Sequence, residues 1–223
     1  MDPAVTPRID VALFPIPNMV AFPGTVVPLH VFEPRYRQLI RDCVRDERLV
    51  GVSHTRKTIR EAKKNQTREE VLSSNQATYQ PQEIFSAGSC EIVETTDDGR
   101  LLAEITMLRR LAIIEEVQSL PYRIVSCQDV EDEAQGRSGS AEKVSRNKDL
   151  QTLINAKLTT LMAGQNPELV RLLQDEHWKA QSPDEFSFKM FQFLRFDPEL
   201  MQNILETRST HQRLTTVWEL LSQ

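Results

Sequence analysis

The most constraining feature of this chain is a stretch near its N-terminus, LFPIPNMVAFPGTVVPLHVFEPRYRQL at residues 13–39, where five of the twelve prolines stand among apolar residues. Proline lacks a backbone N–H and fixes φ, so the stretch cannot form one continuous helix or one central strand. It instead predicts two short strands, at residues 11–14 and 25–31, joined by a stiff loop. Pro28 places the second strand at an edge or a bulge.

A helix is predicted to follow at once. Pro34 suits the first helical position, and apolar residues then recur three and four apart along one face. The face expected to be buried carries Tyr36, Leu39, Ile40, Cys43 and Val44, and the outer face is expected to carry Arg35, Arg37, Arg41 and Arg45.

Strand patterns continue as far as residue 130. The segments LVGVS (49–53), GSCEIVET (88–95), RLLAEITML (100–108), RRLAIIEEV (109–117) and YRIVSCQDV (122–130) are all rich in β-forming residues. The sequence DDG at residues 97–99 predicts a tight hairpin turn. Residues 54–82 are polar and are expected to form a surface insertion, partly helical or mobile. Residues 1–130 therefore predict a mainly β unit with one amphipathic helix.

The C-terminal part has the pattern of an α-helical bundle. Residues 131–147 are charged and small and are interpreted as a linker, and residues 148–223 follow helical periodicity. Its helix starts carry capping residues before proline or a capping partner. The predicted caps are Asn166, Ser182, Asp197 and Ser209. The predicted class is α+β, with a β barrel or sandwich followed by helices. Several phenylalanines at residues 186–196 leave self-association open.

Composition narrows the classes of function. The net charge of the 223 residues is -5, which gives no global attraction to nucleic acid or to anionic membranes. The N-terminus lacks the basic and apolar segments of a signal peptide, and no window has about 18 consecutive apolar residues, so neither export nor membrane insertion is expected. Three cysteines without a CxxC pair are interpreted as reduced core thiols of a cytoplasmic protein.

The sequence offers little for catalysis. A phosphate-binding GxxxxGK[ST] loop and a GxSxG nucleophile elbow are both missing from it, and its four histidines stand too far apart to suggest a zinc site. We therefore expect no enzyme activity, no metal and no cofactor. Cys90 is the best nucleophile candidate, although a buried structural thiol is the favoured interpretation.

The stretch at residues 13–39 resembles the start of the Lon N-terminal, or substrate-binding, domain family, in its prolines, Gly24, His30 and the run Glu33-Pro34-Arg35-Tyr36. The segments DDGRLLAEITMLRRLAIIEE and FDPELMQNILETRSTHQRLTTVWELL are similar to later parts of that family. The resemblance implies a PUA-like barrel or sandwich joined to a helical bundle, which recognises unfolded or tagged protein segments. It also implies a stand-alone recognition module, because the ATPase and peptidase of the full protease have no counterpart in this sequence.

The leading hypothesis is a non-catalytic module that binds exposed apolar peptide segments, or a protein partner such as a protease. The residues expected to make the contacts are Met19, Phe22, Glu33, Arg35 and Tyr36. Phe22 has the alternative of filling the core, and Glu33 with Arg35 that of locking the loop to the helix. On the binding hypothesis, Arg35→Glu weakens binding with little loss of stability.

The second hypothesis is RNA binding by the basic stretch in the insertion, although nucleic acid is not the expected partner. The residues concerned are Arg56, Lys57, Arg60, Lys63 and Lys64. Phosphate contacts of this kind predict an affinity that falls steeply with salt. Nearby glutamates dilute the stretch, so a solvated surface is the alternative reading.

Overall fold

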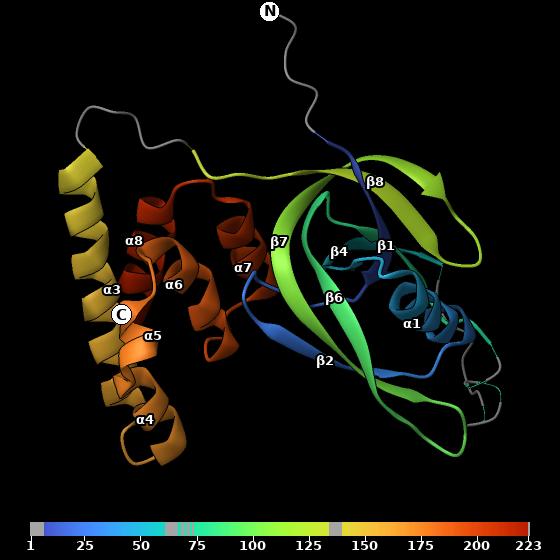
Figure 1. Ribbon diagram of the computed structural model, residues 1–223, viewed down its shortest axis with the longest axis horizontal. Helices are drawn as coiled ribbons and strands as arrows, with labels where there is room; N and C mark the ends of the chain where they lie inside the picture. The colour runs from blue at the N-terminus through green and yellow to red at the C-terminus, as the bar shows by residue number, and fades with distance from the viewer. Residues whose placement is uncertain are drawn as a thin grey trace, which may run out of the picture. The chain divides into compact units, whose positions relative to one another are not determined.

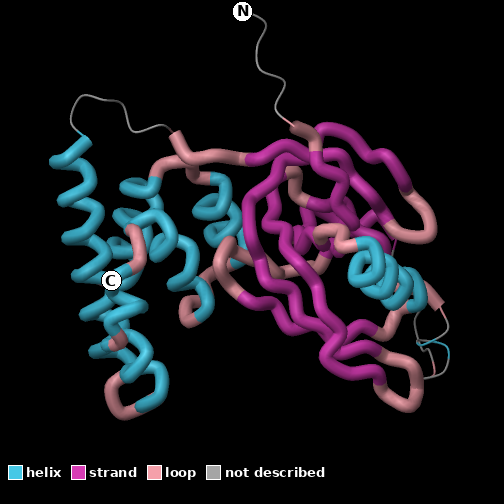
Figure 2. Tube along the Cα trace, in the orientation of Figure 1, coloured by secondary structure: helices cyan, strands magenta, loops and turns pink. Residues whose placement is uncertain are grey.

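The computed structural model describes residues 7–60, 67, 70, 72, 74–133 and 140–222 of the chain. It divides into two compact units. The first combines Met1–Val130 with Arg195–Leu205, and the second combines Glu131–Leu194 with Glu206–Gln223. The sequence predicted a change of structure after residue 130, but not the return of residues 195–205 to the first unit. Figure 2 shows that the strands belong to the first unit and that the second is helical.

The first unit contains a closed sheet (Figure 1). Its strands are β1 (Ile9–Pro15), β2 (Val26–Val31), β3 (Val50–Ser53), β6 (Ile84–Thr95), β7 (Leu101–Gln118) and β8 (Arg123–Asp129). They follow the order β2-β7-β6-β3-β1-β8, and an additional β7–β8 pairing closes the ring. β1 and β3 are parallel, and the other neighbours are antiparallel. The predicted α+β class and its barrel are thus present.

β7 closes the barrel because it is long enough to serve two neighbours on the same edge. Its first part pairs with β2, with Val26 opposite Thr106, and its last part pairs with β8. The sequence predicted two shorter strands here, but the structure has one strand of 18 residues. Its register against β6 shifts at Gly88, where an added Cβ would lie 1.8 Å from the Thr106 carbonyl oxygen. Such bulges bend a strand, which lets one strand continue around a barrel.

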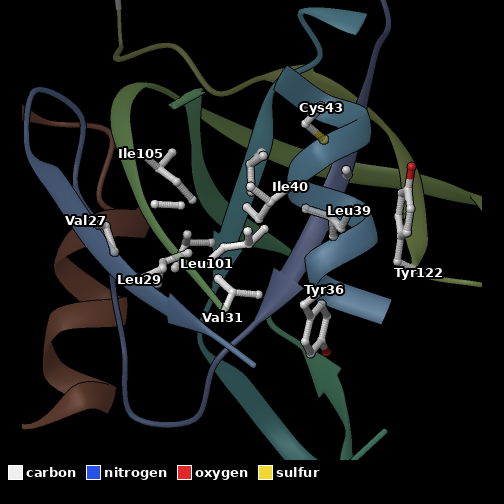
Figure 3. Close-up of a cluster of buried hydrophobic side chains, with 14 of the residues drawn as sticks. Val27, Leu29, Val31, Tyr36, Leu39, Ile40, Cys43, Leu101, Ile105 and Tyr122 are labelled. Carbon is white, nitrogen blue, oxygen red and sulfur yellow. The ribbon is translucent and has the colours of Figure 1, made fainter. Parts of the chain in front are cut away.

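Helix α1 (Pro34–Asp46) packs beside β6 and β1 and buries the predicted face. Figure 3 shows its Leu39 and Ile40 beside Val27, Leu29 and Val31 of β2 in one apolar cluster. The predicted burial is confirmed for Tyr36, Leu39, Ile40 and Cys43, but Val44 is 39% exposed. The predicted outer face is also partly wrong, because Arg35 and Arg37 are half-buried and bonded to other segments.

The region predicted as a polar insertion contains a second, two-stranded sheet. It pairs β4 (Thr55–Arg60) with β5 (Thr78–Pro81) in antiparallel register. The predicted partly helical or mobile character concerns mainly residues between these strands, most of which lie outside the described residues. Within the described part of residues 54–82, residues 70 and 72 are helical, which agrees with a partly helical insertion. The two strands were not predicted, because their polar side chains hid the β signal.

The second unit is built from helices. They are α3 (Ser140–Met162), α4 (Pro167–Gln174), α5 (Glu176–Ala180), α6 (Pro183–Lys189), the 3₁₀ turn Met190–Gln192 and α8 (Thr210–Leu221). Helix α7 (Pro198–Glu206) lies mainly in the first unit. The side chains of Asn166, Ser182 and Ser209 accept the predicted cap hydrogen bonds, and Asp197 accepts one from the Glu199 N–H.

Two expectations about the C-terminal part change. Helix α3 begins at Ser140, inside the range 131–147 that was interpreted as a linker. Small and charged residues are compatible with a helix that packs on neighbouring helices, and composition alone does not reveal such packing. Of the five phenylalanines at residues 186–196, Phe186, Phe188 and Phe191 are buried, and Phe193 and Phe196 are half-buried. The basis for expecting self-association through exposed phenylalanines is therefore absent.

Candidate functional site

The loop after β1 is fixed by a tight turn. Pro17 and Asn18 occupy its centre, Asn18 has φ 59°, and the Met19 N–H donates to the Ile16 carbonyl at 3.4 Å. Proline followed by a residue with positive φ is the pattern of a type II turn. The Asn18 N–H donates to Nδ1 of His54 at 3.1 Å, so the histidine proton sits on Nε2, which lies 3.2 Å from Glu199 Oε1. The loop is thereby held against the end of β3 and the start of α7.

An apolar groove with a cavity volume of about 420 Å³ lies beside this turn. Its walls come from the loop after β1, from the second half of β2 with the residues leading into α1, and from the segment before β5. The lining residues are Phe14, Pro15, Ile16, Pro17, Met19, Pro28, Leu29, His30, Val31, Phe32, Glu33, Arg35, Tyr36, Gln76, Ala77 and Tyr79. Most of these side chains are apolar, and the prolines make the walls stiff. The groove can therefore hold apolar side chains without much ordering on binding.

Tyr36 forms one wall of the groove. Its ring stacks on Phe14, with centroids 4.0 Å apart and an interplanar angle of 15°, and the Arg35 guanidinium carbon lies 4.5 Å from the Tyr36 ring centroid. Burial raises the pKa of the Tyr36 hydroxyl to about 12. The phenol is therefore protonated at physiological pH and can donate a hydrogen bond.

A second wall is a strap formed by residues 75–78, which Glu33 and Arg35 hold at the start of α1. Glu33 Oε2 accepts from the Gln76 N–H at 2.9 Å and lies 2.9 Å from Arg35 Nη2. Arg35 also donates to the Ala77 carbonyl at 2.5 Å and to the Thr78 hydroxyl at 3.3 Å. Two nearly buried opposite charges thus neutralise each other, and the rim at this point carries no net charge.

A more polar pocket of about 480 Å³ adjoins the groove and shares Pro15, Arg35, Tyr36 and Tyr79 with it. All three tyrosines of the chain, Tyr36, Tyr79 and Tyr122, line this pocket. Arg123 also lines it, donates to the Tyr79 carbonyl at 3.1 Å and pairs with Glu116 at 3.3 Å. The groove is therefore continued by a surface able to hydrogen-bond a polar ligand group.

The structure brings four of the five predicted contact residues together in the groove. Met19, Glu33, Arg35 and Tyr36 all line it. Phe22 does not, because it is only 1% exposed. Its carbonyl accepts hydrogen bonds from the Thr25 N–H and hydroxyl, so the end of the loop turns the aromatic ring into the core. In this structure Phe22 therefore fills the core, which is the alternative that the sequence left open for it.

The sequence missed several groove residues. Phe14, Ile16 and Phe32 are half-buried and lie next to prolines or to the helix start. Proximity to a proline was not a usable signal, because Val27 and Leu29 flank Pro28 in β2 and are buried in the core. Gln76 and Ala77 carried no signal either, because only the folded chain brings the strap to α1.

The two alternative functions, catalysis at Cys90 and RNA binding by the basic stretch, gain little support from the described residues. Burial raises the pKa of Cys90 to about 11, so its thiol is protonated and a poor nucleophile. Arg56 of the basic stretch pairs with Glu83 at 3.0 Å, Lys57 is exposed, and Lys63 and Lys64 lie outside the described residues.

The described ranges hold no group of three or more acidic, cysteine or histidine side chains placed to bind a metal ion. Within the same ranges, no helix has the length and apolarity needed to cross a membrane.

A closed barrel with a largely apolar groove, accompanied by a helical unit, is an arrangement suited to binding apolar ligand groups. Residues 10–223 match the family model described as the ATP-dependent protease La (LON) substrate-binding domain. The chain therefore belongs to the Lon substrate-binding domain family, as its opening motif predicted.

Relatives and solved structures agree with this assignment. The chain is 24% identical over 217 residues to Lon protease 1 of Herpetosiphon aurantiacus and 26% identical over 225 residues to Lon protease of Anaeromyxobacter dehalogenans. These alignments cover 96% and 99% of this chain but 24% and 23% of the relatives, so the chain spans about a quarter of their length.

The fold resembles the N-terminal domain of the Mycobacterium avium complex Lon protease, with a TM-score of 0.65, 16% identity, and coverage of 96% of this chain and 98% of that one. A Lon N-terminal domain protein from Xanthomonas campestris gives a TM-score of 0.52 at 20% identity, covering 93% of this chain and 96% of that one. At these identities the similarity shows a shared fold.

Proposed function

We propose that this chain is a non-catalytic recognition module that binds exposed apolar segments of unfolded or tagged proteins in the groove beside β2. The observation that carries the proposal is the groove itself, whose walls are apolar, held by prolines and neutral at the Glu33–Arg35 pair. Membership of a substrate-binding domain family supports it. We infer a role in protein quality control in the cytoplasm, where the three unpaired thiols would remain reduced.

The energetics favour an apolar and uncharged segment. Removing apolar surface from water contributes about 25 cal/mol per Å², whereas a charged side chain in the groove would lose hydration without gaining an opposite charge. Glu33 and Arg35 already pair with each other at 2.9 Å and would have to separate to neutralise a ligand charge. Peptides with apolar residues should therefore bind more tightly than acidic or basic peptides of the same length.

The test is a fluorescence anisotropy titration of reduced, carbamidomethylated α-lactalbumin, an unfolded protein whose blocked cysteines carry no added charge, with the wild-type chain and Met19→Asp. Met19 lines the groove and is half-buried, so a carboxylate there should weaken binding by about tenfold. Val93→Asp is the matched control, because Val93 is 60% exposed on β6 and does not line the groove. Met19→Gln has a side chain of similar volume and no charge, so it still tests the groove if Met19→Asp fails to fold. Equal affinities of the wild-type chain, Met19→Asp and Met19→Gln would exclude the groove as the site.

A further inference from the structure

The groove runs along the free edge of a β-strand. β2 is the first strand in the sheet order and has β7 as its neighbour on one side. Residues 28–32, which belong to this strand and its exit, line the groove. An edge strand carries backbone N–H and C=O groups that face away from its neighbour and are free to pair with another chain. The groove therefore borders backbone as well as side chains.

The register identifies which backbone groups face outward. The Met107 N–H donates to the Thr25 carbonyl, and β2 continues in the same antiparallel register, with Val27 opposite Ile105 and Leu29 opposite Ala103. In an antiparallel pair, alternate residues exchange hydrogen bonds with the neighbour and the residues between them point away. Odd-numbered residues of β2 thus bond β7, and Pro28 and His30 direct their backbone groups outward.

These outward groups are unused in the part of the chain that the structure describes. The His30 N–H, the His30 carbonyl and the Pro28 carbonyl have no hydrogen-bond partner there. Their side chains are exposed, and the His30 ring contacts Arg100, with Nε2 3.0 Å from Arg100 Nη1. Because Pro28 has no N–H, the edge offers one donor and two acceptors over this length, which is a short ladder.

We propose that a bound segment lies in the groove as an added β-strand, paired through its backbone to His30 and Pro28 of β2. The inference rests on the proposed function, since it assigns a conformation to the segment held in that groove. The occupant is an extended, uncharged peptide whose apolar side chains alternate with others, because alternate side chains of a strand point to one face. Backbone pairing is independent of sequence, so the edge can accept many segments while the groove selects for apolar ones.

Pro28 limits what can pair with this edge. A proline at an outward-facing position removes a donor without disturbing the ladder to β7, and such residues discourage long edge-to-edge association. The edge therefore admits a short added strand beside the groove and disfavours pairing along its whole length with a second copy of the chain. Pro28 thus favours a short added strand over a second copy of the chain as the partner of this edge.

The test uses a capped, fluorescent nonapeptide that alternates leucine and serine, in three forms: unmodified, N-methylated at every leucine, and N-methylated at every serine. In an extended strand the N–H groups of the leucines point to one edge and those of the serines to the other. Pairing with β2 predicts that one methylated set binds at least about fivefold more weakly and that the other binds like the parent. The affected set also gives the direction of the added strand.

On the protein side, His30→Pro removes the outward N–H, and His30→Ala keeps it while losing the same ring contact with Arg100. We expect about fivefold weaker binding for His30→Pro than for His30→Ala, and tighter binding for Pro28→Ala, which gains a donor. Pro28→Ala keeps the test decisive if the proline at position 30 disturbs folding. Equal binding by both methylated peptides would overturn the added strand and leave the groove intact. Failure of the unmodified peptide to bind would instead count against the proposed function.

Discussion

Glu33 and Arg35 form a salt bridge of 2.9 Å in which the two side chains are only 13% and 12% exposed. The pair faces the groove but is already occupied by the strap, through the Gln76 N–H and the Ala77 carbonyl. An exposed, unpaired arginine could bind a ligand, and its replacement would cost little stability. Arg35 is nearly buried and already paired, so its first role is to position the walls of the groove.

The first prediction follows from that burial. Arg35→Glu would place a second carboxylate beside Glu33 and release the strap, so we expect the free energy of unfolding in urea to fall by about 3 kcal/mol. This differs from the sequence-based expectation that stability would hardly change. Arg41→Glu is the matched control, because it makes the same change of charge at an exposed position of α1. If both variants unfold at the wild-type midpoint, the strap is not held by this pair.

The second prediction concerns the C-terminal end of α1. Glu47 has φ 51°, in the left-handed region, and its N–H donates to the Cys43 carbonyl. Side chains with a Cβ are strained there and glycine is not, although glycine also loosens the unfolded chain. We expect Glu47→Gly to raise the free energy of unfolding by about 0.5 kcal/mol, as measured by chemical denaturation. Arg48→Gly, one residue further on, should lower it, since no strain is relieved there.

Much of this fold could be predicted from local signals. Pro34 and the spacing of Tyr36, Leu39 and Ile40 defined α1, and the capping residues defined several helices of the second unit. Signals of this kind are local because they depend on residues within one or two turns. The continuity of β7 was missed, because it depends on two different neighbours pairing with one strand.

The site was predictable to the extent that the proline-rich stretch contains it. Met19 and Tyr36, which were predicted to contact a ligand, line the groove, whereas Phe22 turns inward. No local pattern separates an aromatic residue that packs from one that lines a groove. The strap at residues 75–78 comes from a polar segment some forty residues away, and its contacts with Glu33 and Arg35 exist only in the folded chain. A contact of that sequence separation leaves no periodicity in the sequence.

The third prediction concerns thiol reactivity. Burial raises the pKa to about 12 for Cys43 and Cys127 and to about 11 for Cys90. Since the thiolate is the reactive form, all three thiols should react with Ellman's reagent at pH 8 far more slowly in the native protein than in urea. Cys90 is half-buried and should react first. Cys90→Ser should remove the fastest native phase, and a rapid native reaction at Cys90 would revive the nucleophile alternative.

The fourth prediction concerns the cluster around Arg213 in the second unit. Arg213 is fully buried and pairs with Asp132 at 2.6 Å and with Asp184 at 2.7 Å, so one positive charge meets two carboxylates. Burial, followed by the hydrogen bond and charge of Asp132, raises the pKa of Asp184 above its ordinary value. A raised pKa means that folding favours the protonated form of Asp184. Its contribution to stability is therefore full in acid and is lost as the pH rises through the folded-state pKa.

Asp184→Asn keeps the shape of the side chain and removes the charge that folding disfavours. We expect this variant to be more stable than the wild type at pH 7, with a difference that shrinks as the pH falls below the pKa of Asp184 in the folded protein. Asp132→Asn should instead destabilise the chain at pH 7, since Asp132 provides two contacts to Arg213, at 2.7 Å and 2.6 Å. Urea denaturation of the three proteins between pH 3 and pH 8 separates the roles. A loss of stability in Asp184→Asn at pH 7 would mean that its attraction to Arg213 outweighs its burial and the repulsion from Asp132.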